Sequence, residues 1–296
     1  MKSLTVFTPT YNRKTYLYKC YDSLCKQNNK DFEWLIIDDG STDGTSELVE
    51  KWIKSNDEFK IRYIYKENGG LHTAYNVAIE NINTELAMCI DSDDYVFDNA
   101  IDKILKFWER NRNDNIAGIV GLDCYENGDI IGDLLPKKKS INLIDLLVGK
   151  YKINNGDRKI VVRTNLYKSV APMKSFNNEK NFNPHYMHLL ISKQYNFLVF
   201  NERLCVVEYQ ADGMTMNILN QFYNSPRSFL EIRRLYLSFE NTSLKFKFKN
   251  IIHLISSSIL CGEKYWYKEI DNKLLAFLAL PFGIFLSQYL RVKCKR

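Results

Sequence analysis

The segment Leu86–Asp94, with the sequence LAMCIDSDD, joins an apolar run to three closely spaced acids. The apolar run has strand length, and ending a buried strand on charges costs free energy. Carboxylates this close repel one another unless a cation, or a ligand that brings one, compensates them. Mg²⁺ and Mn²⁺ suit such a site because hard divalent ions favour carboxylate oxygens and bind phosphates. A lone Asp-x-Asp is more often only the polar turn after a strand. Whether this one is a metal site therefore depends on the rest of the chain.

Further strand–helix units surround this segment. Strands are predicted at Leu4–Phe7, Phe32–Ile37 and Ile61–Tyr65, with helices between them that have one apolar face. Repeated units of this kind predict a parallel sheet covered by helices on both faces, with ligands beyond the carboxyl ends of the strands. A polar cluster follows each predicted strand: Thr8–Asn12, Asp38–Gly44, Glu67–Gly70 and Asp91–Asp94. We therefore expect four polar clusters to converge on one edge of one sheet.

The second half of the chain has a more mixed pattern. Strands are predicted at Ile116–Cys124, Ile130–Ile131, Lys159–Val162 and Phe197–Tyr209. No long linker separates this half from the first, so we expect one continuous domain. Helix-like, basic segments begin near Asn217.

The composition indicates a globular protein and argues against a nucleic-acid-binding one. The 296 residues are 45% hydrophobic and 26% charged, as in a globular protein. The net charge is +6, but Lys245–Arg296 alone has ten Lys/Arg against three Asp/Glu. This argues against a nucleic-acid-binding body and for an anionic surface as the partner of the C-terminal tail. Seven cysteines without metal-site spacing, and no visible signal peptide, favour a reducing cytoplasm.

The polar clusters suggest nucleotide chemistry. The glycines of Asp38–Gly44 permit tight turns, and a carboxylate there can accept hydrogen bonds from a nucleobase or ribose. Tyr11 could stack on a base, although a lone aromatic residue is more often packed. The N–H groups of Asn68–Gly70, at the start of a helix, would favour a phosphate.

Together these clusters resemble family 2 glycosyltransferases. The resemblance rests on Thr8–Arg13, Asp38–Asp43, Asn68–Gly70 with Asn76, and Asp91–Asp94. It implies a GT-A fold, in which a mostly parallel α/β sheet is flanked by helices, here with a C-terminal helical extension. It also implies an inverting transferase that uses a nucleotide-diphosphate sugar, most often UDP-linked, with Mn²⁺ or Mg²⁺.

Site residues follow from this resemblance by position. The resemblance implies that Asp93 holds the metal, with Asp91 as a possible second ligand, and that Tyr11 and Asp39 hold base and ribose. The full set implied to bind the nucleotide is Thr8, Pro9, Tyr11, Asp39, Asn68, Gly69, Gly70 and Asp91. Residues 1–115 would form the nucleotide-sugar half, 116–216 the acceptor half, and 217–296 a basic helical region.

The catalytic base is expected in the second half. Members of the family place a pair of acids ahead of a helix there, but Phe176–His185 contains only Glu179. Glu179 is therefore the predicted base, with His185 as the alternative, because an imidazole titrates in a suitable range. Asp212 and Gly213 either shape an acceptor loop or form a polar turn.

The tail contains an apolar run of 17 residues, Leu274–Leu290, flanked by basic residues. This length is at the lower limit for a transmembrane helix, so an interfacial helix fits better, with a helix packed on the core as the competitor. We expect a cytoplasmic enzyme, peripheral at the inner face of the membrane, that extends a lipid-linked glycan for capsule or O-antigen. The rivals are a nucleotidyltransferase and a non-catalytic nucleotide-sugar-binding subunit of a synthase complex.

Overall fold

The computed structural model describes residues 2–210, 213 and 216–294. Contacts divide the chain into two compact units. The first unit comprises Met1–Met173 and Met187–Glu208, and the second comprises Lys174–Tyr186 and Tyr209–Arg296. The segment Lys174–Tyr186, which contains both candidate bases, therefore groups with the C-terminal helices. Asp212 lies outside the described residues.

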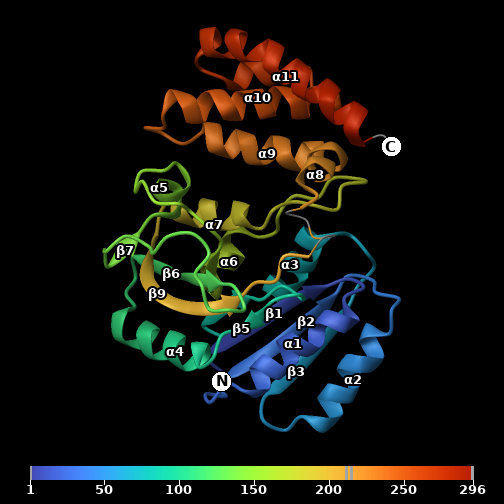
Figure 1. Ribbon diagram of the computed structural model, residues 1–296, viewed down its shortest axis with the longest axis vertical. Helices are drawn as coiled ribbons and strands as arrows, with labels where there is room; N and C mark the ends of the chain where they lie inside the picture. The colour runs from blue at the N-terminus through green and yellow to red at the C-terminus, as the bar shows by residue number, and fades with distance from the viewer. Residues whose placement is uncertain (1, 211–212, 214–215, 295–296) are drawn as a thin grey trace. The chain divides into compact units, whose positions relative to one another are not determined.

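The first unit begins with alternating strands and helices (Figure 1). They are β1 (Leu4–Thr10), α1 (Lys14–Cys25), β2 (Phe32–Asp38), α2 (Thr45–Ser55), β3 (Lys60–Tyr65), α3 (Leu71–Asn81), β4 (Leu86–Cys89), β5 (Tyr95–Val96) and α4 (Ala100–Asn111). The chain continues with β6 (Ile116–Cys124), β7 (Ser140–Ile141), α5 (Leu143–Leu147), β8 (Arg158–Arg163), α6 (Thr164–Val170), α7 (His185–Ser192) and β9 (Asn196–Val206).

All the strands form one mixed sheet with the order β3-β2-β1-β4-β8-β6-β9-β5, and β7 pairs with β9. The first four strands are parallel, whereas β8 runs antiparallel to both β4 and β6. The chain moves outward from β1 to β3 and then returns to place β4 on the other side of β1. This reversal makes the carboxyl ends of β1 and β4 the topological switch point, where ligands bind in open α/β sheets.

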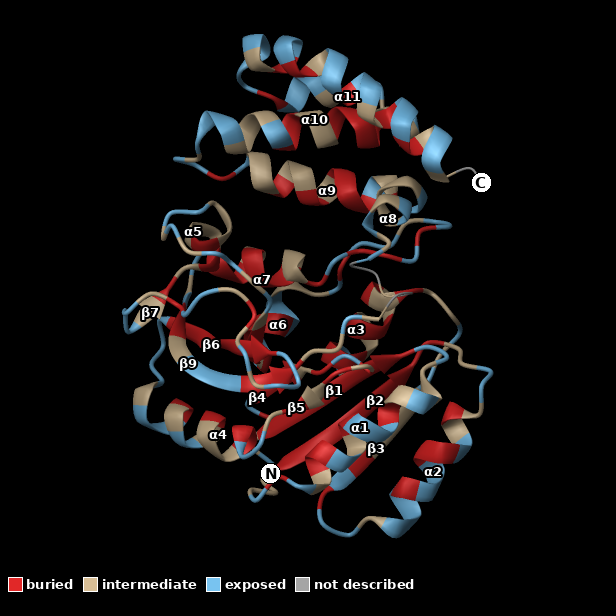
Figure 2. Ribbon diagram, in the orientation of Figure 1, coloured by how far each residue is buried: buried red, intermediate tan, exposed pale blue. Residues whose placement is uncertain are grey.

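Helices cover both faces of the parallel part, so β1 and β2 are buried along their whole length (Figure 2). On one face, α1, α2 and α4 pack on the sheet through residues such as Leu17, Val49 and Ile104. On the other face, Phe7 contacts Tyr75 of α3 and Tyr167 of α6. Burial on both faces explains why these strands read as continuous apolar runs.

The second unit is helical. It contains α8 (Ile218–Asn224), α9 (Pro226–Leu237), α10 (Leu244–Cys261), the 3₁₀ turn η1 (Trp266–Glu269) and α11 (Lys273–Cys294). Helix α10 packs against both α9 and α11 around Leu230, Leu254 and Ala279. Helix α11 has 22 residues, and an apolar stretch of 18 of them has a mean hydropathy of 1.5, with 28% of that stretch buried. By length and composition alone, the helix could cross a bilayer.

The structure confirms the predicted α/β fold with a C-terminal helical region. The strand prediction at Ile116–Cys124 matches β6, and those in the first hundred residues match β1 to β4 within three residues. The prediction at Ile130–Ile131 is wrong, because Ile130 makes only an isolated bridge to Cys124. The prediction at Phe197–Tyr209 runs past the end of β9 at Val206.

Candidate functional site

The acids that follow β4 lie at the switch point and differ in burial. Asp91 is exposed, Asp93 is half-buried and Asp94 is buried. Asp94 accepts a hydrogen bond from the N–H of Glu208, 3.2 Å away, just beyond the end of β9. The acidic turn is therefore held in place by Asp94, while Asp91 is directed to solvent.

A buried lysine lies behind this turn. The Nζ of Lys159, on β8, is 3.9 Å from Asp94 Oδ2, and both side chains are less than a tenth exposed. Asp123, at the end of β6, is also buried, and its Oδ1 has no hydrogen-bond partner among the described residues. Because β8 lies between β4 and β6, it inserts one cation between two carboxylates.

Burial, and to a smaller extent the neighbouring acids, shift the pKa values of this cluster. Burial raises the pKa of Asp94 to about 8; Lys159 opposes this shift, and the neighbouring acids reinforce it. Burial also raises the pKa of Asp123 to about 6 against the same opposition from Lys159. Burial disfavours the ammonium of Lys159, but Asp123 and the other neighbouring acids outweigh it and raise its pKa well above the usual value. The lysine compensates only part of the negative charge, which favours a further cation in front of the turn.

The residues present fit a divalent ion that is shared with a phosphate. Asp91 and Asp93 would supply two carboxylates, and Mg²⁺ or Mn²⁺ commonly completes its shell with substrate phosphates and water. Within residues 2–210, 213 and 216–294, no group of three or more His, Cys, Asp and Glu side chains forms a self-contained metal site.

Asp39 organises the neighbouring loop. Asp39 is 4% exposed, and its carboxylate accepts hydrogen bonds from the N–H of Gly69 at 2.9 Å and of Gly70 at 2.7 Å. Lys66 forms an ion pair with it, and Asn68 Nδ2 donates to it from 3.2 Å. The sequence predicts a phosphate at these N–H groups, but in the structure the Asp39 carboxylate is the anion at the start of α3.

The loops after β1 and β2 are tied together. The side-chain oxygen of Asn12 accepts a hydrogen bond from the N–H of Thr42, and the N–H of Asn12 donates to the Ser41 hydroxyl. Gly40 has a φ of +88°, and a Cβ at this position would lie 2.8 Å from the backbone nitrogen of Asn68. Only glycine therefore permits this close approach without displacement.

The end of β1 contains one side chain that sequence analysis missed. Thr8 and Pro9 are buried, and the Thr8 hydroxyl accepts the indole N–H of Trp34 at 3.0 Å. The Thr8 side chain thus belongs to the core. Thr10 is 3% exposed and its hydroxyl has no partner among the described residues, whereas Tyr11 is 48% exposed. At this strand end Tyr11 is therefore the side chain exposed to a ligand, whereas Thr10 contributes a buried hydroxyl without a partner in the part of the chain that the structure describes.

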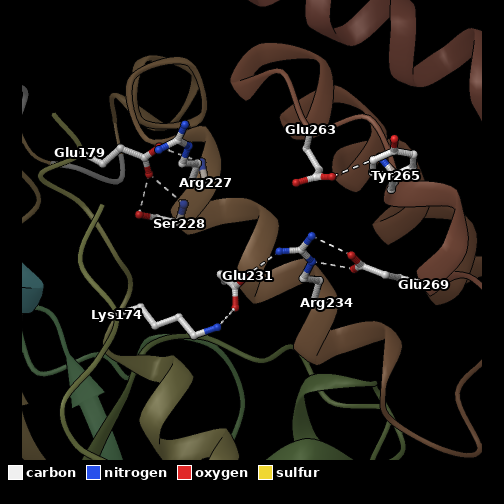
Figure 3. A network of polar contacts seen from close by, with 9 residues as sticks. All are labelled: Lys174, Glu179, Arg227, Ser228, Glu231, Arg234, Glu263, Tyr265 and Glu269. Carbon is white, nitrogen blue, oxygen red and sulfur yellow. Dashed lines mark hydrogen bonds and ion pairs between the residues drawn. The ribbon is translucent and has the colours of Figure 1, made fainter. Parts of the chain in front are cut away.

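In the second unit, Glu179 caps a helix (Figure 3). Glu179 is 7% exposed, and its carboxylate accepts hydrogen bonds from the N–H of Arg227 and from the N–H and hydroxyl of Ser228, at 2.7–2.8 Å. These donors belong to the first turn of α9, where N–H groups have no partner within the helix. Glu179 therefore fastens the segment Lys174–Tyr186 to α9.

His185 begins α7. Its N–H donates to the side chain of Asn183 at 2.9 Å, an arrangement that caps the helix. Burial lowers the pKa of the His185 imidazole to about 4, so the ring is neutral near pH 7. His188, one turn later, contacts the Tyr167 hydroxyl through Nε2 at 2.6 Å and is packed in the first unit.

Comparison with known proteins identifies the family. The sequence profile described as "Glycosyl transferase family 2" matches residues 5–216. The chain belongs to glycosyl transferase family 2. The match includes the switch-point acids, the loops after β1 and β2, and both candidate bases.

The relatives of this family 2 chain share mainly its N-terminal half. Glycosyltransferase GlyA of Streptococcus pneumoniae is 35% identical over 103 residues, which are 35% of this chain and 14% of GlyA. The uncharacterized glycosyltransferase EpsJ of Bacillus subtilis is 28% identical over 141 residues, 48% of this chain and 39% of EpsJ. The chain thus matches well under half of the length of either relative.

Solved structures confirm the GT-A fold. Residues 1–349 of S. aureus TarS, in complex with UDP-GlcNAc, align over 99% of this chain and 91% of that one, with a TM-score of 0.58 and 17% identity. Mannosyltransferase PcManGT from Pyrobaculum calidifontis, in complex with GDP-Man and Mn²⁺, aligns over 99% and 86%, with a TM-score of 0.60 and 15% identity. At these identities the likeness concerns the fold alone.

Proposed function

We propose that this family 2 chain transfers a sugar, with inversion, from a nucleotide-diphosphate sugar to a hydroxyl of a glycan acceptor. The observation that supports it best is the partly compensated acid turn at the β1/β4 switch point. Two structures of the same fold are complexes with nucleotide sugars, one of them with Mn²⁺. We propose a UDP-linked donor, the most frequent in the family.

The exposure and contacts of each residue suggest its role in binding the nucleotide-sugar donor. We propose that Tyr11 stacks on the base and that Asp39 shapes the ribose site through the loop Lys66–Gly70, which its carboxylate holds in place. Asn68, Gly69 and Gly70 then act by shaping that loop. Thr8 and Pro9 act by placing the backbone at the end of β1. Asp91 would face the nucleotide, and Asp93 the metal.

The chemistry requires a stabilised leaving group and a base. A bound Mn²⁺ or Mg²⁺ supplies positive charge that offsets the charge on the departing diphosphate. Lys159 keeps the carboxylates behind the site compensated, and Asp94 holds the acidic turn. A base in this reaction takes the proton of the acceptor hydroxyl as its oxygen attacks the anomeric carbon.

The contacts of Glu179 argue against it as the catalytic base and favour His185 in that role. All three donors on Glu179 come from α9, so its carboxylate is committed to capping a helix. His185 lies in the segment that Glu179 fastens, and burial keeps its imidazole neutral near pH 7, the form that a general base requires before it takes a proton. We therefore propose His185 as the base and Glu179 as the residue that positions its segment.

The proposal also covers the acceptor of the sugar and the location of the protein in the cell. We propose a lipid-linked glycan at the cytoplasmic face of the membrane, with the chain as a peripheral protein in surface-polysaccharide synthesis. One related protein is named teichoic acid poly(glycerol phosphate) polymerase, with 37% identity over 34% of this chain. The outward apolar residues of α11 support a membrane location.

The experiment that tests the transfer measures which product leaves the donor. Purified full-length chain is incubated with Mn²⁺ and a panel of nucleotide sugars, and free nucleoside diphosphate and pyrophosphate are quantified. The proposal expects nucleoside diphosphate from at least one donor. Release of pyrophosphate would indicate a nucleotidyltransferase, and binding without any turnover would indicate a non-catalytic subunit.

The base is tested by His185→Gln, which removes the imidazole and retains a polar side chain. We expect turnover to fall by about 10²–10⁴-fold, because a positioned base contributes that much. The affinity for the donor and the thermal unfolding temperature should stay near those of the parent. Unchanged turnover would exclude His185 as the base.

A further inference from the structure

Much of α11 is exposed along its length (Figure 2), and most of the exposed residues are apolar. At 3.6 residues per turn, its exposed large apolar residues fall within a sector about 160° wide, which also contains the exposed Gln288. They are Leu274, Phe277, Leu278, Phe282, Ile284, Phe285, Tyr289 and Val292. Phe277, Phe285 and Val292 are more than 70% exposed. Such a contiguous exposed face marks an interaction site rather than ordinary surface.

The inward face of α11 is built from small residues. Four of its five buried residues are small, Ala276, Ala279, Gly283 and Ser287, and the fifth is Leu290 near the end of the helix. A Cβ at Gly283 would lie 2.5 Å from Ile255 Cγ2 of α10, so the two helices approach closely there. Large side chains outside and small ones inside reverse the pattern of a helix in a soluble protein. The same arrangement is typical of helices that pack together while facing lipid.

The charges on α11 lie at its ends. Lys273 at its first position and Lys293 in its last turn are exposed, Arg291 is partly exposed, and the helix has no Asp or Glu. Long basic side chains at such positions can keep their charge at the headgroups while their stems cover apolar surface. The ten Lys/Arg and three Asp/Glu of residues 245–296 complement an anionic surface.

The packing of α11 favours a helix that lies in the plane of the membrane. Its inner face is held by α10, and Arg291 donates to the Ile259 carbonyl of α10 from 3.4 Å. Helix α10 in turn contacts α9, where Arg233 donates to Asn250 at 2.8 Å. Crossing a bilayer would require α11 to leave this core or to bring buried polar groups with it, which is costly.

We propose that the outward face of α11 docks in the plane of an anionic lipid bilayer. The apolar face enters the boundary between headgroups and acyl chains, and the terminal basic residues contact acidic headgroups. This rests on the proposed function only for the location of the acceptor. Vesicle binding and nucleoside diphosphate release are separate readouts, so either proposal can fail while the other holds.

The test is co-sedimentation of the full-length chain with phosphatidylcholine vesicles that contain or lack phosphatidylglycerol. We expect binding to the anionic vesicles, at least tenfold weaker binding to the neutral ones, and loss of binding in concentrated salt, which screens exposed charges. Phe277→Gln combined with Phe285→Gln should weaken binding at least tenfold. The matched control is Ile53→Gln with Leu134→Gln, two exposed apolar residues of the first unit. All four positions are exposed, so these variants should unfold at the parent temperature.

Three results would overturn the proposal. Equal binding of the phenylalanine variant and the control would show that this face is not the docking surface. Association that survives both salt and alkaline carbonate would indicate a transmembrane helix. Absence of binding to either vesicle, with a doubled mass in solution that the phenylalanine variant abolishes, would show that a second copy covers the face.

Discussion

The sheet of the first unit and the last helix of the second depart from ordinary burial in opposite directions. Lys159, Asp94 and Asp123 are ionisable residues at most 7% exposed, whereas Phe277 and Phe285 of α11 are over 70% exposed. Charged residues are seldom fully buried unless paired, and large exposed apolar faces are rare. We propose that each unusual set of residues lies beside a binding partner. The buried ionisable residues lie behind the site of a metal-bound diphosphate, and the exposed apolar residues of α11 contact lipid.

Lys159→Met would test the buried charges most severely. It leaves Asp94 and Asp123 without their common cation, and removing one partner of a buried ion pair costs about 3–5 kcal/mol. We expect a loss of that size in the free energy of unfolding, measured by urea denaturation.

The matched control is Lys103→Met. Lys103 pairs with Glu202 in solvent, and the side chains of both are at least 40% exposed. An exposed pair contributes no more than about 1 kcal/mol. Equal losses for the two variants would show that Lys159 does not stabilise the acid cluster.

Glu179→Gln tests the capping role in the second unit. Glutamine keeps one acceptor oxygen but turns an NH₂ group toward the N–H donors of α9, so we expect a loss of about 1–3 kcal/mol by urea denaturation. Glu263→Gln is the control, because Glu263 accepts a single N–H, from Tyr265 at 3.1 Å (Figure 3). A turnover defect without any loss of stability would return Glu179 to the role of base.

Acid should weaken the second unit through His253 of α10. Burial, with smaller effects of Arg233 and Lys249, lowers the pKa of His253 to about 3. Below about pH 6.5 His253 is therefore protonated in the unfolded chain but stays neutral in the folded chain. The free energy of unfolding consequently falls as the pH is lowered from about 6.5 toward 3. His253→Phe should reduce the drop in melting temperature between pH 7 and pH 5 by a few degrees. An unchanged drop would show that His253 is not responsible.

Sequence analysis located the elements whose signal is local. β6 could be bounded because it is a long apolar run between polar turns, and the acid turn because it follows a buried strand. The two-residue strands β5 and β7 were missed because each exists only through pairing with β9, far along the chain. No local pattern encodes such pairing.

The same limit applies to the site. Lys159 lies about 65 positions beyond the acids it compensates, and β8 brings it there by inserting between β4 and β6. The available signal was a single lysine at the start of the buried run Ile160–Val162. Glu179 was assigned as an acid near a helix start, but its capping of α9 depends on a contact 48 residues away.

The most direct test of the central claim is calorimetry of Mn²⁺-dependent binding of UDP to Asp93→Asn. The control is Asp114→Asn, an exposed acid outside the site. The account predicts that Asp93→Asn loses Mn²⁺-dependent binding while its unfolding temperature stays the same or rises, because removing one charge relieves repulsion among the acids. The control should bind like the parent. If Asp93→Asn bound UDP and Mn²⁺ with the parent's affinity, the acid turn would not be the metal-nucleotide site.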